Sequence, residues 1–164
     1  MYDRVVPENA RTRPAASRSE DDAIVDDLER ILVGAVGLTT QALSIADPGF
    51  ELTFPQWRAL LVVGEEGDGA RISEVATRVG VTVPATSRML RRLERRGLVI
   101  LADDDLDRRA TRARLTGRGE RVRGTILGHR RAVLRELVAA TPSRERTRLQ
   151  TSLRPIAEGL ERFA

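Results

Sequence analysis

The sequence contains no cysteine and a single histidine, His129. The absence of thiols excludes disulfides, thiol redox sensing and thiolate metal sites, and one histidine excludes a metal centre built from several imidazoles. There is also no unbroken run of about 18 apolar residues, so we expect no membrane span, and we expect neither a metal nor a cofactor. The N-terminal segment is polar and contains arginine without an apolar stretch. This pattern is unlike a secretory signal and predicts a cytoplasmic protein.

Lysine is absent as well, and every basic residue is arginine. Residues 71–121 contain 13 Arg against seven acidic residues, whereas the rest of the chain has a slight acidic excess. Coding bias explains much of the preference for Arg over Lys, so the location of the charge carries the argument. Arginine suits phosphate and guanine contacts, and a basic segment of this kind suits a polyanion.

Aromatic residues make up only 3% of the chain, and the helix formers Ala, Leu, Arg and Glu dominate. We therefore predict a mainly α fold with a small β-hairpin. Residues 1–18 are expected to form a disordered tail, and residues 19–164 a single domain. Capping residues, Gly turns and apolar spacing predict helices from near Ser19, after Thr53, over about 72–79 and 83–96, after Thr116 and from Thr141–Pro142. Strands are expected at 98–101 and 111–115.

Two of these details rest on single residues. Ser73 or the residue before it is expected to cap the helix over 72–79. Pro155 lies inside the last predicted helix and is expected to kink it.

The helices over 72–79 and 83–96 are joined by Gly80–Val81, which is typical of a helix-turn-helix. One side of the second helix collects apolar residues, and the opposite side collects small residues and arginines. The predicted DNA-contacting residues of this segment are Thr82, Pro84, Ala85, Ser87, Arg88, Arg91, Arg92 and Arg95. Such a helix fits the major groove, because its small residues permit close approach and its arginines reach bases or phosphates. A charged solvated face on an ordinary amphipathic helix is the alternative.

The hairpin that follows favours the DNA-binding interpretation. Arg108 and Arg109 lie at its turn, where an arginine suits a narrow minor groove. Asp107 is expected to brace a neighbouring arginine. Asp103–Asp105 are expected to point away from DNA, because phosphates repel carboxylates.

Several segments in this order resemble the MarR family of winged helix-turn-helix transcriptional regulators. The resemblance covers about residues 50–121 and rests on the segments Leu52–Trp57, Ile72–Ala76, Val79–Val81, Ser87–Arg88, Leu90–Val99, Asp107–Arg109 and Leu115–Thr116 with Gly119. The terminal helices match only in length and pattern, and Pro155 departs from the family.

The resemblance implies a homodimer with a DNA-binding lobe over residues 51–115 and dimerisation helices over 19–50 and 116–164. The residues expected at the dimer interface are Ile24, Leu28, Ile31, Leu149, Leu153, Ile156, Leu160 and Phe163. It also implies a pocket for a small organic effector, near which we expect Leu43, Phe54, Trp57 and Leu60. For Trp57 a plain core position is the alternative.

The expected function is a non-enzymatic regulator, a repressor that binds an inverted-repeat operator in double-stranded DNA and is released by its effector. No phosphate loop or nucleophile motif supports an enzyme. Two alternatives remain open: an architectural DNA-binding protein without sequence preference, and a module that docks a protein partner through its helical platform.

Overall fold

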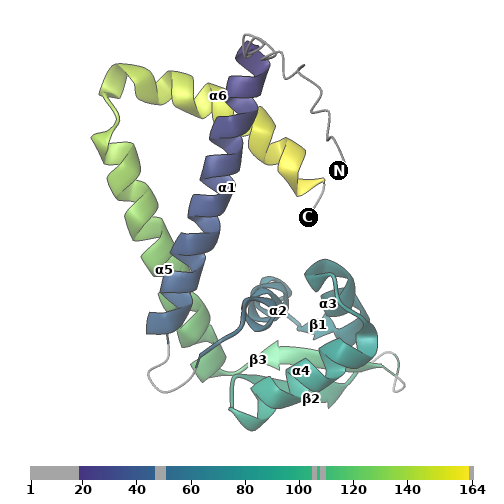
Figure 1. Ribbon diagram of the computed structural model, residues 1–164. Helices are drawn as coiled ribbons and strands as arrows, with labels where there is room; N and C mark the ends of the chain where they lie inside the picture. Colours follow the sequence, from purple (N-terminus) through teal and green to yellow (C-terminus); the bar gives the residue numbers. More distant parts are fainter. Residues whose placement is uncertain (1–18, 47–50, 105–106, 108–109, 163–164) are drawn as a thin grey trace, which may run out of the picture. The chain divides into compact units, whose positions relative to one another are not determined.

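A helix, three short helices, a hairpin and two further helices follow one another along the chain (Figure 1). The computed structural model describes residues 19–46, 51–104, 107 and 110–162. The expected tail over 1–18, the hairpin residues Arg108 and Arg109, and Phe163 lie outside these ranges. The chain divides into two units, Met1–Val36 and Gly37–Ala164, which are described separately.

Helix α1 (Glu20–Ile45) begins at the predicted cap. The Ser19 amide donates to Asp22 Oδ2 at 3.1 Å, and the Asp22 amide donates to Ser19 Oγ at 3.1 Å. Within the first unit the apolar residues of this helix are largely exposed, with Ile24 at 50% and Ile31 at 57%. Within the second unit its last turns contribute Ala42 and Leu43 to the core.

By length and mean hydropathy alone, α1 qualifies as a membrane span. An 18-residue window of the helix has a mean hydropathy of 1.2, and 17% of that window is buried. The sequence expectation missed this, because it considered only unbroken apolar runs. A core helix of a soluble protein meets the same criterion.

The second unit continues with α2 (Phe54–Glu65), α3 (Ile72–Val79) and α4 (Val83–Arg95). Thr53 and Gln56 form a reciprocal capping box at the start of α2. The cap of α3 differs from the prediction: Arg71 occupies the N-cap position, and its amide donates to Glu74 Oε2 at 2.8 Å. Ser73 therefore lies inside the helix.

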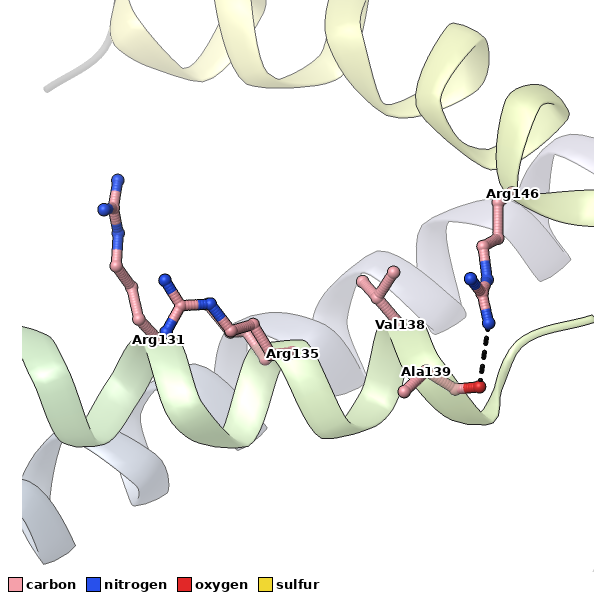
Figure 2. A pocket seen from close by; sticks show the side chains of 6 residues that line it. Arg131, Arg135, Val138, Ala139 and Arg146 are labelled. Carbon is pink, nitrogen blue, oxygen red and sulfur yellow. Dashed lines mark hydrogen bonds between the residues drawn. The ribbon is translucent and has the colours of Figure 1, made fainter. Parts of the chain in front are cut away.

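The C-terminal helices are α5 (Gly117–Ala140) and α6 (Ser143–Glu161). Pro142 is the N-cap of α6, whereas the predicted cap Thr141 closes α5 by donating from Oγ1 to the Leu137 carbonyl at 3.2 Å. Arg146 joins the two helices, because its Nη2 donates to the Ala139 carbonyl at 3.0 Å (Figure 2). Helix α6 continues through Pro155.

The strands form a three-stranded antiparallel sheet in the order β1-β3-β2. The hairpin pairs β2 (Val99–Asp103) with β3 (Thr111–Leu115). The third strand, β1 (Ala70–Arg71), was not predicted, and its Ala70 lies opposite Ala113 of β3. A mainly helical fold with a small antiparallel wing is thus confirmed.

The hydrophobic core of the second unit lies between α2, α4, the sheet and the first half of α5. Its largest fully buried apolar side chains are Trp57, Leu60, Leu90, Leu93, Leu98 and Ile126. This core fixes one face of α4 and leaves the opposite face exposed.

Candidate nucleic-acid interface

The turn between α3 and α4 requires glycine. Gly80 has φ +79°, a left-handed conformation that residues with a side chain rarely adopt. The Gly80 and Val81 amides both donate to the Ala76 carbonyl, at 3.0 and 3.1 Å. These bonds close α3 and direct the chain into α4 after a short connection.

Helix α2 holds the C-terminal end of α3. Arg58 Nη2 donates to the Arg78 carbonyl at 2.6 Å. The positive charge of Arg58 also interacts favourably with the negative, C-terminal end of the α3 dipole. Arg78 in turn forms an ion pair with Glu65 at the end of α2. Helices α2 and α3 are therefore joined by polar contacts as well as by the core.

Helix α4 is anchored along its buried side. Thr86, Leu90 and Leu93 are fully buried, and Thr86 Oγ1 donates to the Thr82 carbonyl at 3.1 Å. At the other end of the helix, Glu94 Oε1 accepts from the Leu101 amide of β2 at 3.0 Å. These contacts fix the rotation of α4 about its axis.

The opposite side of α4 carries the predicted DNA-contacting residues. Ala85 and Ser87 are half-buried, and the exposed members are Thr82, Pro84, Arg88, Arg91, Arg92 and Arg95. Val83, which the sequence pattern placed on the buried side, is 49% exposed because it lies in the first turn. The exposed surface thus begins with small or uncharged residues and continues with arginines.

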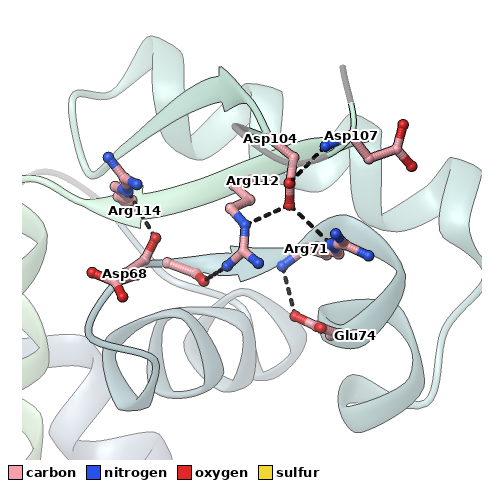
Figure 3. A network of polar contacts seen from close by, with 8 residues as sticks. Asp68, Arg71, Glu74, Asp104, Asp107, Arg112 and Arg114 are labelled. Carbon is pink, nitrogen blue, oxygen red and sulfur yellow. Dashed lines mark hydrogen bonds and ion pairs between the residues drawn. The ribbon is translucent and has the colours of Figure 1, made fainter. Parts of the chain in front are cut away.

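A buried carboxylate holds the wing (Figure 3). The Asp104 side chain is 1% exposed, and its Oδ2 accepts from Arg71 Nε at 2.8 Å and Arg112 Nε at 2.5 Å. Its Oδ1 accepts from the Asp107 amide at 3.1 Å. The hydrogen bond from Arg71 and the charge of Asp104 raise the pKa of Arg71 above its ordinary value. Asp104 therefore links β1, β3 and the start of the hairpin turn.

This network was not predicted. The expectation that Asp103–Asp105 point away from DNA did not distinguish among the three residues: Asp104 is buried inside the wing and Asp103 is exposed. Asp105 lies outside the described residues. Asp107 is exposed and takes part through its backbone: its amide donates to Asp104, and its carbonyl accepts from the Ala110 amide at 2.8 Å. Asp104 and Arg71 lie far apart in the sequence, and no local sequence pattern identifies them as partners.

The base of the wing is tied to the start of α5. Thr116 Oγ1 donates to the Gly97 carbonyl at 2.6 Å and accepts from the Gly119 amide at 3.0 Å. A Cβ at Gly119 would overlap the Leu98 carbonyl oxygen, so only glycine permits this approach. Arg118 Nη1 adds a bond to the Arg96 carbonyl at 3.1 Å. The end of α4, the sheet and α5 are therefore joined.

The four residues expected near an effector pocket lie in two places. Leu43 and Phe54 line a hollow of about 250 Å³ with Thr40, Ser44, Glu51 and Leu52. Trp57 and Leu60 are buried in the core, with 1% and 0% of their surface exposed.

The residues expected at a dimer interface are half-buried or exposed in the single chain. Leu28 and Ile156 are half-buried, and the exposed members are Ile24, Ile31, Leu149, Leu153 and Leu160. The described residues contain no group of three or more His, Asp or Glu side chains that would hold a metal ion.

Comparison with known proteins identifies the fold. A model of the MarR family matches residues 50–110. Among solved structures, RV1404 from Mycobacterium tuberculosis is similar with a TM-score of 0.76 and 29% identity, over 88% of this chain and 97% of that one. FabT from Streptococcus pneumoniae, solved in complex with DNA, has a TM-score of 0.75 and 18% identity over 88% and 100%.

A third structure, CouR from Rhodococcus jostii RHA1 bound to p-coumaroyl-CoA, has a TM-score of 0.62 and 24% identity over 86% and 96%. A search of curated proteins gave no match. The family match covers α2 to the hairpin, which is the segment that presents α4 and the wing. Residues 50–110 thus match the MarR family, and the chain has the winged helix-turn-helix fold of a non-enzymatic, DNA-binding transcriptional regulator.

Proposed function

We propose that this protein is a sequence-specific repressor that binds an inverted-repeat operator as a homodimer and acts in the cytoplasm. The observation that carries the proposal is the exposed side of α4, where small residues precede Arg88, Arg91 and Arg92 on a helix held fast by its buried side. In this proposal α4 enters the major groove and the hairpin turn reaches the adjacent minor groove.

The exposed apolar residues support the homodimer. Ile24, Ile31, Leu149, Leu153 and Leu160 are each at least 37% exposed in the single chain, and burying them stabilises an assembly. Sedimentation at micromolar concentration is expected to give twice the chain mass of 18.1 kDa. A monomer that still binds an operator tightly would contradict this part of the proposal.

The third part of the proposal is that a small organic ligand releases the protein from DNA. The hollow lined by Leu43 and Phe54 supplies an apolar wall beside the polar Ser44 and Glu51, a combination found in small-molecule sites. CouR, which shares the fold, was solved with p-coumaroyl-CoA. A panel of aromatic carboxylates and acyl thioesters is therefore the first to test against DNA binding. A panel that never weakens binding would argue against an effector.

The test of sequence reading is a selection from random duplexes, followed by competition at fixed salt. Replacing Arg88 by Ala is expected to cost about 1–3 kcal/mol at one base pair in each half-site, if Arg88 reads a guanine through two hydrogen bonds. The half-site centres are expected about 34–36 Å apart. Arg144→Ala is the matched control, because this side chain is 86% exposed on α6.

Two results would contradict the proposal that the protein recognises a specific DNA sequence. Equal losses of affinity for Arg88→Ala on selected and random duplexes would assign Arg88 to phosphate contacts alone. If the wild type preferred no duplex, the protein would be an architectural DNA-binding protein.

A further inference from the structure

A hollow of about 330 Å³ lies between α3, the first half of α4 and the start of β3. Three hydroxyl side chains line it, one from each element: Ser73 of α3, Ser87 of α4 and Thr111 of β3. None of the three hydroxyls has a hydrogen-bond partner among the described residues. By contrast, the Thr77 and Thr86 hydroxyls donate to carbonyls one turn earlier. The hollow therefore presents free hydroxyl donors to a group with acceptor oxygens.

A guanidinium group held in place also lines this hollow, and it belongs to Arg71. Its Nε donates to Asp104 Oδ2 at 2.8 Å, and the Asp104 side chain is 1% exposed (Figure 3). No described residue accepts from the terminal nitrogens of Arg71, whose side chain is 34% exposed. Asp104 also accepts from Arg112, so one carboxylate faces two guanidinium groups and the trio keeps a net positive charge. No carboxylate is among the described residues that line the hollow. These charges suit an anion.

The position of the hollow relative to DNA follows from the docking proposed above. If α4 enters the major groove and the hairpin turn reaches the adjacent minor groove, the strand that separates these grooves runs between α4 and β3. The hollow lies between these two elements. Its remaining lining is apolar and comprises Ile72, Val83 and Ala110. A DNA strand matches both parts, because it offers phosphate oxygens beside the apolar carbons of deoxyribose.

We propose that this hollow seats a phosphate of the DNA strand that separates the two grooves. Ser73, Ser87 and Thr111 donate hydrogen bonds to the phosphate oxygens. Arg71 supplies the positive charge, and Asp104 positions it. The proposal rests on the DNA binding proposed above. Such a contact carries no base information and fixes the register and orientation of α4 on the duplex.

The test removes two hydroxyls and leaves the ion pairs of Asp104 intact. The hollow variant is Ser73→Ala with Thr111→Val, which keeps the shape of the threonine. The control, Ser152→Ala with Thr77→Val, removes the same groups from exposed positions that do not line the hollow. Urea denaturation checks that both variants are folded.

The first measurement is the Kd for selected and random duplexes. The hollow variant is expected to have a Kd at least about tenfold above that of the control, because hydrogen bonds to a charged group are lost in each half-site. The factor is expected to be the same on both kinds of duplex, since every duplex carries the phosphate. The salt slope is expected to stay unchanged, because neutral hydroxyls release no counterions. Equal Kd values for the hollow variant and the control would overturn the proposal.

The second measurement replaces one phosphate at a time by a neutral methylphosphonate in the selected duplex. For the wild type, the loss of affinity is expected to include one phosphate per half-site on the strand between the two grooves. At that phosphate the hollow variant is expected to lose at least about threefold less, because both changes remove the same contact. Equal losses for both proteins at every phosphate would overturn the proposal, since the hydroxyls would then act only through the fold. A wild type that preferred no duplex would contradict sequence recognition alone, and the loss on random duplexes would still test the phosphate contact.

Discussion

Replacing Asp104 by Ala tests whether the buried carboxylate holds the wing. The substitution removes the hydrogen bonds that the Asp104 carboxylate accepts from Arg71, Arg112 and the Asp107 amide. Breaking a fully buried pair costs about 3–5 kcal/mol. The Arg71 and Arg112 side chains are 34% and 24% exposed, so water partly replaces the missing carboxylate. We therefore expect the free energy of unfolding to fall by about 2–4 kcal/mol for Asp104→Ala.

Urea denaturation measures this decrease, and two further variants interpret it. Asp104→Asn keeps an acceptor for the Asp107 amide and removes the charge, so its stability is expected to fall by about half as much. Asp103→Ala is the control, because this neighbour is exposed and is expected to change stability by less than about 0.5 kcal/mol. The DNA affinity of Asp104→Asn is also expected to be lower than that of the wild type, measured under conditions in which the variant stays folded. A decrease below about 1 kcal/mol for Asp104→Ala would refute the assignment of Asp104 as the brace of the wing.

Three further predictions concern DNA binding, packing and redox response. Arg108→Ala or Arg109→Ala is expected to weaken binding to all duplexes. The slope of log K against log salt concentration is expected to fall by about 0.9 for each phosphate that the variant no longer neutralises, or by about 1.8 for both wings of a dimer. Unchanged affinity and slope in both variants would show that the hairpin does not touch DNA. Gly119→Ala is expected to destabilise the fold by more than about 1 kcal/mol, because its Cβ overlaps the Leu98 carbonyl. Gly117→Ala is the control, since the nearest heavy atom to its Cβ is 3.7 Å away, and equal melting temperatures would refute the argument. Peroxide is expected to leave operator binding unchanged over minutes, because the sequence has no thiol, and a rapid release of DNA would contradict this.

Local signals predicted the helical part of the fold well. The Ser19–Asp22 cap, the Gly80 turn and the Thr116 cap each depend on residues within three or four positions of one another, and each lies where the pattern indicated. The residue types at these positions have few other roles. For this reason the sequence also defined α4 and its arginine-rich side.

Interactions between distant residues were missed. Strand β1 has only two residues, too few for an alternating pattern, and it exists because β3 pairs with it from 41 or more positions away. Asp104 lies in a run of similar aspartates, and its burial depends on Arg71, which is 33 positions away. For Trp57 the family pattern cannot distinguish a pocket wall from the core next to it, and the side chain is buried in the core.

The contacts at the start of α5 couple this helix to the DNA-binding lobe, so we expect the two to rotate as one rigid body. Thr116, Arg118 and Gly119 tie the helix to the segment that ends α4, so a tilt is passed on rather than absorbed. The 24 residues of α5 span about 36 Å, so a tilt of about 5° at the far end moves the lobe by about 3 Å. Hydrogen bonds to bases tolerate a few tenths of an ångström. In a dimer in which the C-terminal ends of the two α5 helices meet, a small change of packing there would move both α4 helices out of register with the DNA.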